Sequence, residues 1–483
     1  MTYYQKKYLK FGLKFVKVNG KYQYVFAQGL YTFQEVSDMI ATESYIPVAT
    51  AAELNALRND VSQTMGAGSP WQGTYTTGLD KKYVQVDDLD LVGFANFNSF
   101  PNFSGIIDGN ELNIYNLKID AGSGPAALIL DALTGTLMNM RIDAEIITTG
   151  AYAAVYATIP RPNGVIDNCI SFGTVTGNGP YLGGIAGLSE TVIKNCKNYA
   201  IISGGQYTGG IAGRVTTATD CENLGDTVTG GQYTGGITGQ ATTITGCINN
   251  SDVQGTEQGG GIAGLVTTAT NCTNNGDVTM TTRWGGGISY QSTTITGCTN
   301  NGTITSFGNT VGGITGNHSA AAKISLCVNK GAVIQIGTME NAGGIAGFQN
   351  NANSIIENCY NKGSVASDNR RVGGIVGSMG NGTVINCYSS GLISGVSYTG
   401  GIIGLRTSGT ITNTYYDTDT SGQSDTGKGL PRTTLQMQQG TADSFILPGG
   451  GIDEDSLAAN AMYTDWSNDI WEFTPDNEYP KLK

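Results

Sequence analysis

The sequence predicts an all-β chain folded as a right-handed parallel β-helix of about 12 coils. Nine cysteines recur every 25–32 residues, and a Gly-Gly-Ile tripeptide recurs in step with them. Such a period is the signature of one supersecondary unit stacked many times. There are 72 glycines, which suit tight turns, and only 13% charged residues. The right hand follows from the general handedness of parallel crossovers. The cysteines are Cys169, Cys196, Cys221, Cys247, Cys272, Cys298, Cys327, Cys359 and Cys387.

Each coil is expected to hold three short strands. Gly-Gly-Ile-Ala/Thr-Gly forms the first, a Thr-Ile-x-Asn segment the second, and the Val or Ile six or seven residues past the cysteine the third. The same frame continues at Leu117, Met140 and Thr414, where the thiol is replaced. The cysteines are therefore expected to be reduced interior packing. With no Cys-x-x-Cys pair and one histidine, His318, we expect no metal and no cofactor.

A second interior column is predicted from the asparagine two residues past each thiol. Stacked side-chain amides at strand spacing form hydrogen-bonded ladders. The members are Asn198, Asn223, Asn249, Asn274, Asn300, Asn329 and Asn361.

Four segments are expected along the chain. Residues 1–45 hold a small β-element with a hairpin turn at Asn19-Gly20. Residues 46–99 form an N-terminal cap and lead into the solenoid, with a capping box, Thr50 to Glu53, opening a short helix. Residues 100–416 form the solenoid, and residues 417–483 a C-terminal cap that includes a short helix near Thr433.

Charge and hydropathy exclude several partners. The net charge of −12 disfavours nucleic acid, because phosphate binding requires clustered Lys and Arg. No run of 18 apolar residues occurs, so no membrane insertion is expected. Lysines 14 and 17 interrupt the apolar stretch near the N-terminus, so we expect no secretion signal in this sequence.

The repeats resemble those of the GLUG-motif β-helix proteins. The repeated Gly-Gly-Ile-Ala-Gly is similar to the element that names the family, and residues 356–363 resemble its second half. Residues 103–117, 47–54 and 414–417 resemble its first coil, its capping segment and its ending. The resemblance implies a β-helix of the kind found in bacterial surface adhesins, IgA-protease-like proteins and some phage proteins. It implies no shared catalytic residues.

Together these features favour a non-enzymatic structural or adhesive fibre of a bacteriophage virion. Residues 1–45 are expected to dock on other virion proteins, and the outside of the solenoid to bind a host-surface glycan or protein. A homotrimer is possible by analogy with other phage β-helices. The alternatives are a polysaccharide depolymerase tailspike and a bacterial adhesin located outside the cell or at its surface.

The candidate binding residues lie two positions before Gly-Gly-Ile, where the stack forms an exterior column with an aromatic stretch. Aromatic faces can pack against sugar rings, and the alternative is that these rings only shield the neighbouring coil. The candidates are Tyr181, Tyr207, Tyr233, Trp284 and Tyr398, with Arg283 beside them.

Other exterior residues have simpler interpretations. The pattern Thr-Thr-x-Thr recurs at residues 216–219, 242–245, 267–270 and 293–296 and forms a grid like that of ice-binding solenoids, although exposed strands favour threonine anyway. Asp226, Asp252 and Asp277 are expected to be solvated turn residues rather than a cation site. The nearest carboxylates for glycoside cleavage are Asp143 with Glu145, or Glu190. His318 is expected on a surface loop.

Overall fold

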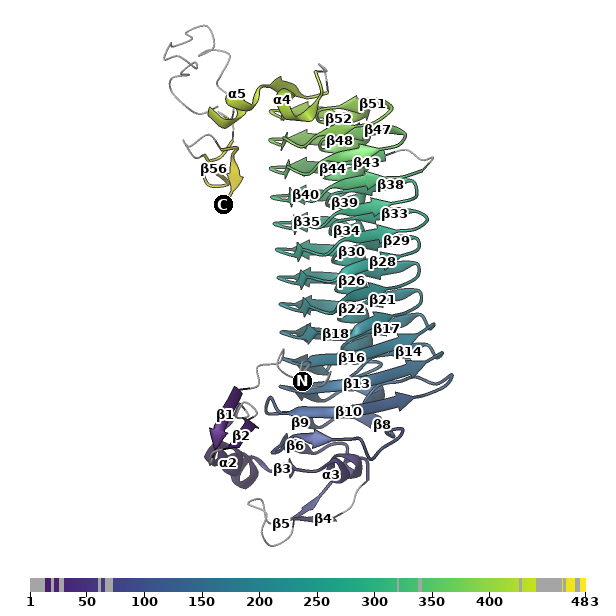
Figure 1. Ribbon diagram of the computed structural model, residues 1–483, viewed down its shortest axis with the longest axis vertical. Helices are drawn as coiled ribbons and strands as arrows, with labels where there is room; N and C mark the ends of the chain where they lie inside the picture. Colours follow the sequence, from purple (N-terminus) through teal and green to yellow (C-terminus); the bar gives the residue numbers. More distant parts are fainter. Residues whose placement is uncertain are drawn as a thin grey trace.

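The computed structural model has one dominant feature, a tall stack of β-coils (Figure 1). It describes residues 14–18, 21–25, 30–59, 62–65, 73–318, 321–337, 341–424, 428–439, 463, 466–473 and 478–483. Strands β8 (Phe100–Phe103) and β11 (Ile129–Leu133) pair in parallel, and a ten-stranded sheet from β14 (Tyr152–Ala153) to β51 (Ser397–Gly400) continues the stack. These two plus ten strands correspond to twelve coils. The predicted parallel β-solenoid is confirmed.

The coil at residues 207–229 illustrates the repeating unit. Strand β21 (Tyr207–Gly209) belongs to the first ladder of parallel strands, β22 (Ala212–Thr219) to the second, and β23 (Glu222–Asn223) with β24 (Thr227–Thr229) to the third. Each strand pairs in register with its equivalent one coil later.

The strand boundaries differ from those expected around Gly-Gly-Ile. Ile211 is buried as predicted, but it sits at the corner between β21 and β22 rather than inside a strand. The expected first and second strands are parts of the one strand β22, and the true first strand, β21, precedes the motif. The chain turns here because the backbone at Gly209 and Gly210 lies almost in contact with atoms of the second and third ladders.

The paired glycines permit this close contact between sheets. A Cβ atom on Gly209 would lie 2.3 Å from the Cα of Thr238, and one on Gly210 would lie 2.3 Å from Asn223 Cγ. Both distances are far below van der Waals contact. The Gly-Gly pair is therefore a packing requirement of the coils that carry Gly-Gly-Ile.

The cysteine column is buried and reduced, as predicted. All nine thiols are free. Along much of the column the backbone N–H of one cysteine points at the sulfur of the next, as from Cys221 to Cys247 at 3.4 Å. Burial raises the pKa of the Cys196 and Cys221 thiols well above the usual value.

Because the thiols are buried, we expect none of them to react with a thiol reagent while the protein is folded. The thiolate is the reactive form, and both low access and a raised pKa suppress it. We expect an aromatic disulfide reagent to titrate no thiol in native buffer and nine after unfolding. Rapid reaction of several thiols under native conditions would contradict the packed column.

The asparagine ladder is also confirmed. The amide of Asn223 donates to Asn249 at 2.9 Å, and that of Asn249 to Asn274 at 2.9 Å. The chain of bonds runs from Asn198 to Asn361, and all its asparagines are fully buried. Most members also donate to the carbonyl two residues ahead, as Asn274 does to Gly276 at 2.8 Å.

The residue just before each cysteine adopts the left-handed backbone conformation. Asparagine or glycine usually occupies this position, with φ of 53° at Asn271 and 65° at Gly297. Both residue types tolerate this region, whereas most side chains clash there. The exceptions are Asp220, at φ 50°, which is a residue type also enriched in this region, and Leu326, at φ 56°, which is not.

We expect Leu326→Asn to raise the free energy of unfolding by about 1 kcal/mol, because it relieves this backbone strain. Leu326 is only partly buried, so little apolar burial is lost. Urea unfolding measures the gain. Leu326→Ala is the control, since alanine keeps the strained Cβ, and an equal gain from alanine would contradict the explanation.

The N-terminal end of the stack is closed by helices. Helix α3 (Ala51–Ala56) begins at the predicted capping box, and its Leu54 joins the main hydrophobic core. The parallel ladders reach back before residue 100, to β3 (Tyr45–Val48), β6 (Lys82–Gln85) and β7 (Leu89–Asp90). β1 (Lys14–Val18) and β2 (Lys21–Val25) pair antiparallel, which confirms the hairpin, although Asn19-Gly20 itself lies outside the described residues.

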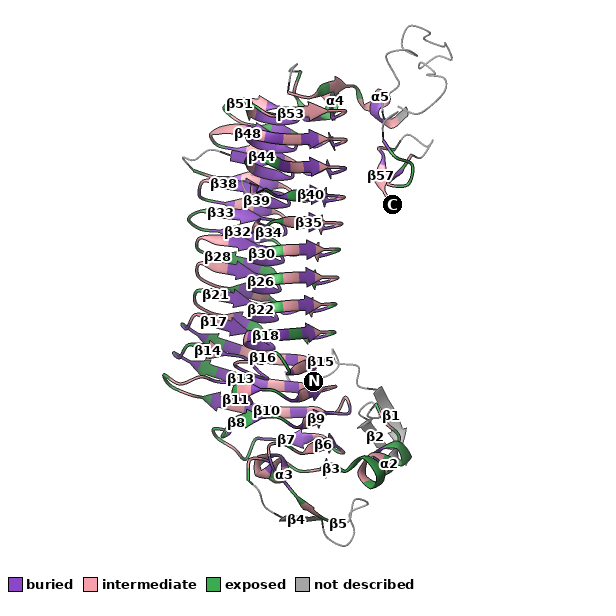
Figure 2. Ribbon diagram, turned by 180° about the vertical axis from the view of Figure 1, so that it is seen from behind, coloured by how far each residue is buried: buried purple, intermediate pink, exposed green. Residues whose placement is uncertain are grey.

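Helix α2 (Phe33–Glu43) is an element the sequence analysis missed. It lies where only a β-element was expected, and Thr32 with Glu35 forms its capping box. Its buried Val36 packs against Tyr45 and Val84, while much of the rest of the helix is exposed (Figure 2). The Thr-x-x-Glu pattern at 32–35 was the available signal.

The C-terminal segments close the last coil and fold back along its flank (Figure 1). β55 (Leu430–Arg432) pairs with β54 (Tyr415–Asp417), and α4 (Thr418–Ser421) and α5 (Thr434–Gln439) lie beside them. The α5 helix matches the one predicted near Thr433. β56 (Trp471–Glu472) pairs antiparallel with β57 (Lys481–Leu482), and Trp471 packs on Tyr360 and Tyr388 of earlier coils. Among the described segments, no helix has the length and apolarity to cross a membrane.

Candidate functional site

Three of the predicted site residues form one continuous ladder of rings. Tyr181, Tyr207 and Tyr233 stack with ring centroids 5.1 and 4.9 Å apart and interplanar angles of 7°. Both faces of the Tyr207 ring are therefore covered by its neighbours, and burial raises the pKa of its hydroxyl. This geometry fits a shielding role for the inner rings, with only ring edges and hydroxyls left toward solvent.

The ladder is longer at its start than the sequence indicated. Tyr152 stacks on Tyr181, with centroids 5.4 Å apart and an interplanar angle of 9°. It was missed because its coil reads Tyr-Ala-Ala-Val, without the Gly-Gly-Ile that marks the nine coils after it. Its spacing of 29 residues from Tyr181 was the signal available.

At its other end the ladder is interrupted by Gln258. Gln258 pairs with Tyr233 on one side and with Trp284 on the other. Among the rings that the structure describes, only Tyr207 stacks on Tyr233, so one face of Tyr233 has no aromatic partner. We call this position the ladder break.

Trp284 and Arg283 lie together beyond the ladder break. Trp284 stacks on Tyr290, with centroids 5.0 Å apart, and the Arg283 guanidinium carbon is 5.3 Å from the Trp284 ring. Arg283 also pairs with Glu257 of the preceding coil at 3.8 Å.

Tyr398 does not join this group. It belongs to the last coil, is half exposed and has a left-handed backbone, φ 52°. Several coils without a ring separate it from Trp284, since the column positions between them are Thr310, Asn341 and Arg371.

The structure also has a surface hollow that the sequence analysis did not assemble. It has a volume of about 410 Å³ and lies on the third ladder, between the segment after β7 and strands β10 (Asn113–Asp120), β13 (Arg141–Thr148) and β16 (Ile170–Gly177). Its lining is Val92, Phe94, Ala95, Asn116, Leu117, Lys118, Asp143, Ala144, Glu145, Gly173 and Thr174.

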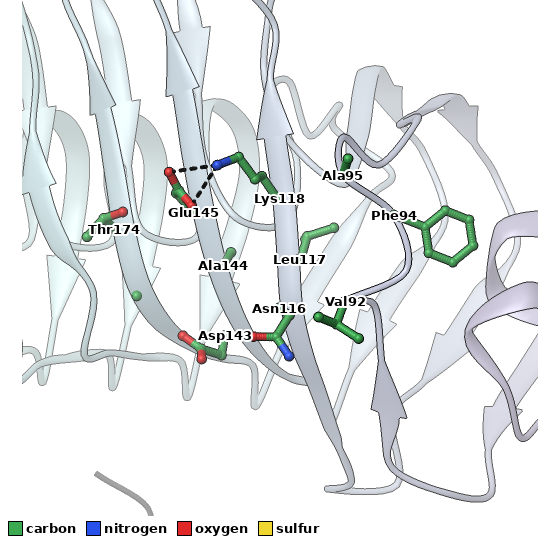
Figure 3. A pocket seen from close by; sticks show the side chains of 11 residues that line it. Val92, Phe94, Ala95, Asn116, Leu117, Lys118, Asp143, Ala144, Glu145 and Thr174 are labelled. Carbon is green, nitrogen blue, oxygen red and sulfur yellow. Dashed lines mark hydrogen bonds and ion pairs between the residues drawn. The ribbon is translucent and has the colours of Figure 1, made fainter. Parts of the chain in front are cut away.

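The polar groups of the hollow come from alternating outward positions of neighbouring strands. Asp143 and Glu145 are two residues apart on β13 and so point to the same face. The Lys118 ammonium lies 3.2 and 3.1 Å from the two Glu145 oxygens (Figure 3). Asn116 adds an amide that donates to Asp90 at 2.7 Å.

The apolar side of the hollow comes from the segment after β7. Val92 is 74% exposed, an unusual position for a valine, and Phe94 is half buried beside it. The lining thus combines the apolar side chain of Val92 with two carboxylates, an ammonium, an amide and the Thr174 hydroxyl, while the Phe94 ring points away from these polar groups (Figure 3). Asp143 and Glu145 were candidates from the sequence, but other residues of the lining, such as Val92, lie more than 50 positions away in the chain.

The remaining candidates are accounted for locally. Glu190 pairs with Arg161 at 3.0 Å and does not line the hollow. The Asp252 and Asp277 carboxylates accept backbone N–H groups of the next coil at 3.0 and 2.7 Å. No cluster of three metal-binding side chains occurs among the residues that the structure describes.

The expectation for His318 was wrong. It lies at the end of β39 (Thr315–His318), fully buried in the core, rather than on a surface loop. Its ring Nε2 faces the carbonyl of Ile355 at 3.3 Å. The polar residues around it in the sequence suggested a loop, but its place in the repeat is an inward strand position.

Comparisons with known proteins agree with the repeat. The family model of the GLUG motif matches residues 368–394, which cover one coil from β47 (Arg370–Gly373) to β50 (Ile393–Ser394). No curated protein matches the chain. A solved structure from Bacteroides ovatus, named provisionally as an immunoglobulin A1 protease, aligns over 92% of this chain and 93% of its own, with 15% identity and a TM-score of 0.35. That likeness is too distant to carry an argument. The chain contains a GLUG motif within a β-solenoid.

Proposed function

We propose that this protein is a non-enzymatic binding solenoid whose hollow on the third ladder takes a sugar of a surface glycan. The observation that carries the proposal is the hollow itself, with the apolar side chain of Val92 and its convergent hydrogen-bonding groups. Small-ligand sites are typically concave, with apolar lining and a few placed polar groups.

The chemistry of the hollow suits a sugar ring. Sugars present apolar C–H faces and many hydroxyls that both donate and accept hydrogen bonds. Val92 offers apolar contact, Asp143 and Glu145 accept, and Lys118 donates. Lys118, Asp143 and Glu145 lie on the paired strands β10 and β13, which limits the ordering entropy that opposes binding. Weak contacts repeated over many copies would then give avidity.

A glycan array followed by calorimetric titration tests this proposal. We expect the double variant Asp143→Asn, Glu145→Gln to weaken binding of the best array glycan by about tenfold or more, since charge-assisted hydrogen bonds become neutral ones. Asp226→Asn is the control, because Asp226 is an exposed turn carboxylate on a later coil. Equal affinity of the double variant and the wild type would contradict the proposal.

The tyrosine column remains a second candidate contact surface. At the ladder break, the face of Tyr233 that has no aromatic partner among the described rings lies on the side of Gln258. Gln258→Tyr would place a ring on that face and extend the ladder. If the column binds glycan, this variant is expected to lose affinity. Unchanged affinity would exclude the column as the binding surface and leave the hollow as the site.

The runner-up function is depolymerisation of a polysaccharide. It is favoured by one feature, the presence of Asp143 and Glu145 on the same face of the hollow, since glycoside cleavage requires two carboxylates across one substrate. If the wild type lowers the viscosity of the polymer and the double variant does not, the function is cleavage of the polysaccharide rather than binding alone. Constant viscosity together with retained binding supports the non-enzymatic proposal.

For its location, we propose a bacteriophage virion fibre that docks on other virion proteins through residues 1–45. The hairpin β1–β2 with its lysines beside an acidic solenoid supports this, as does the elongated shape. Mass spectrometry of purified phage particles tests it. Recovery from bacterial surface fractions instead would favour the adhesin, and light scattering would decide whether a homotrimer forms.

A further inference from the structure

The hollow on the third ladder adjoins a group of exposed apolar side chains. Its lining runs along the rod from the segment after β7, across β10 and β13, to Thr174 on β16 (Figure 3). Thr174 follows Glu145 in register, and Ile201 of β20 (Ile201–Ser203) follows Thr174. Ile201 is 43% exposed. An apolar surface therefore begins in the coil directly after the one that ends the hollow.

A second outward column of the same ladder also changes from polar to apolar at this point. Asp143 of the hollow pairs with Phe172, and the Phe172 ring stacks on that of Tyr199 with centroids 5.0 Å apart. Tyr199 is 37% exposed, and Leu224 holds the equivalent place one coil later. The residues of the two columns form one contiguous group, which we call the apolar strip: Phe172, Tyr199, Ile201 and Leu224.

The apolar strip is short, because both columns become polar again in the following coils. One column continues with Asn250 and Asn275, which are hydrogen-bonded at 2.7 Å, and the other with Asp252 and Asp277. Coils are about 4.8 Å apart, so the strip extends over roughly 10 Å. Single apolar side chains are ordinary on a protein surface, but a contiguous group that borders a hollow indicates a contact surface.

We propose that the hollow and the apolar strip form one elongated site for a linear polysaccharide, which lies along the rod. One sugar unit occupies the hollow, and the following units contact the strip. The inference rests on the proposed glycan-binding function and extends the ligand from a single sugar to an internal stretch of a chain. The Val92 side chain bounds the hollow toward the N-terminal cap, so the polysaccharide continues toward the later coils (Figure 3).

The two parts of the site match the two kinds of surface that successive sugar units present. Sugar rings have apolar C–H faces, which are favourably covered by exposed aliphatic and aromatic side chains. Ile201 and the exposed part of Tyr199 supply such a surface, whereas the carboxylates of the hollow accept from hydroxyls. The Thr174 hydroxyl lies at the border and can both donate and accept. Because the strip and the hollow share this border, one continuous chain is the occupant that fits both.

The length dependence of binding tests the proposal. The probes are the monosaccharide and the tetrasaccharide of the neutral glycan that scores highest on the array, titrated calorimetrically. We expect the wild type to bind the tetrasaccharide about tenfold more tightly than the monosaccharide, or better. Ile201→Thr copies the residues of the coils on either side, Thr174 and Thr227. It is expected to weaken tetrasaccharide binding about fivefold and to leave monosaccharide binding unchanged, because only the strip loses apolar contact.

Ile248→Thr is the matched control for this variant. Ile248 is also exposed on the third ladder, at 37%, but it lies in another column, between Glu222 and Thr273. Thr273 supplies the replacement, so the chemical change is the same as at Ile201. This variant should bind both probes as the wild type does.

The remaining outcomes separate this inference from the proposed function. Equal affinity of the wild type for the two probes, or unchanged tetrasaccharide binding by Ile201→Thr, would overturn the elongated site and leave the hollow as a site for one sugar. Failure of the wild type to bind either probe would remove the proposed function and the inference with it. If Ile201→Thr changes the oligomeric state in light scattering but not the affinity, the strip is a contact between copies of the chain and the inference is wrong.

Discussion

Asn274→Ala is expected to lower the free energy of unfolding by about 4 kcal/mol. Asn274 lies in the middle of the buried ladder: it accepts from Asn249 at 2.9 Å and donates to Asn300 at 2.8 Å. Alanine removes the partner of three buried groups, namely one N–H of the Asn249 amide, which keeps its bond to the Ser251 carbonyl, the Asn300 oxygen and the Gly276 carbonyl. Each unpaired group costs about 1–3 kcal/mol. Denaturant unfolding followed by circular dichroism measures the loss.

The next residue provides the control for that prediction. Asn275 also bonds to its equivalents, Asn250 and Asn301, both at 2.7 Å, but its ladder is exposed to water. Water replaces the lost partners there, so Asn275→Ala should change stability by less than about 0.5 kcal/mol. Similar losses from the two variants would show that burial is not what makes the inner ladder essential.

The second large effect is a loss of stability in mild acid caused by His318. Burial lowers the pKa of His318 from 6.5 to about 4. Above pH 6.5 the ring is neutral in both the folded and unfolded states, and its neutrality costs nothing. As the pH falls from 6.5 toward 4, the unfolded chain binds a proton that the folded chain does not bind. Stability therefore falls over that window, by about 3 kcal/mol in total.

His318→Gln tests this assignment, since glutamine follows at the equivalent position of the next coil. The variant has no histidine left, so its unfolding free energy should lose this part of the pH dependence between pH 6.5 and 4. Carboxylates also titrate near pH 4, and the measured quantity is therefore the difference between variant and wild type. A constant difference across the window would contradict the buried neutral ring.

The fold could be predicted from the sequence because the same residue types recur at equivalent positions of successive coils. The Cys, Asn and Gly-Gly-Ile positions each imposed one requirement per coil, and the structure meets each of them. The strand boundaries were harder. Ile211 points into the core whether it lies inside a strand or at a corner between two strands. Only the close contact at Gly209 and Gly210 shows that it lies at a corner. Helix α2 was missed although Thr32 and Glu35 carried its capping signal.

The candidate site was less predictable, for a physical reason. The tyrosine column followed from the period, but whether its faces are free depends on stacking geometry that spacing alone does not specify. The hollow joins Val92 to Glu145, residues of different coils and of a non-repeating segment, so no period points to it. His318 was placed wrongly because its polar neighbours outweighed its position in the repeat.

A crystal structure of the protein soaked with the best glycan from the array tests the central claim most directly. We expect sugar density in the hollow, with hydroxyls within hydrogen-bond distance of Asp143 or Glu145 and a ring against Val92. Sugar bound along the tyrosine column, or anywhere else while the hollow holds none, would contradict it.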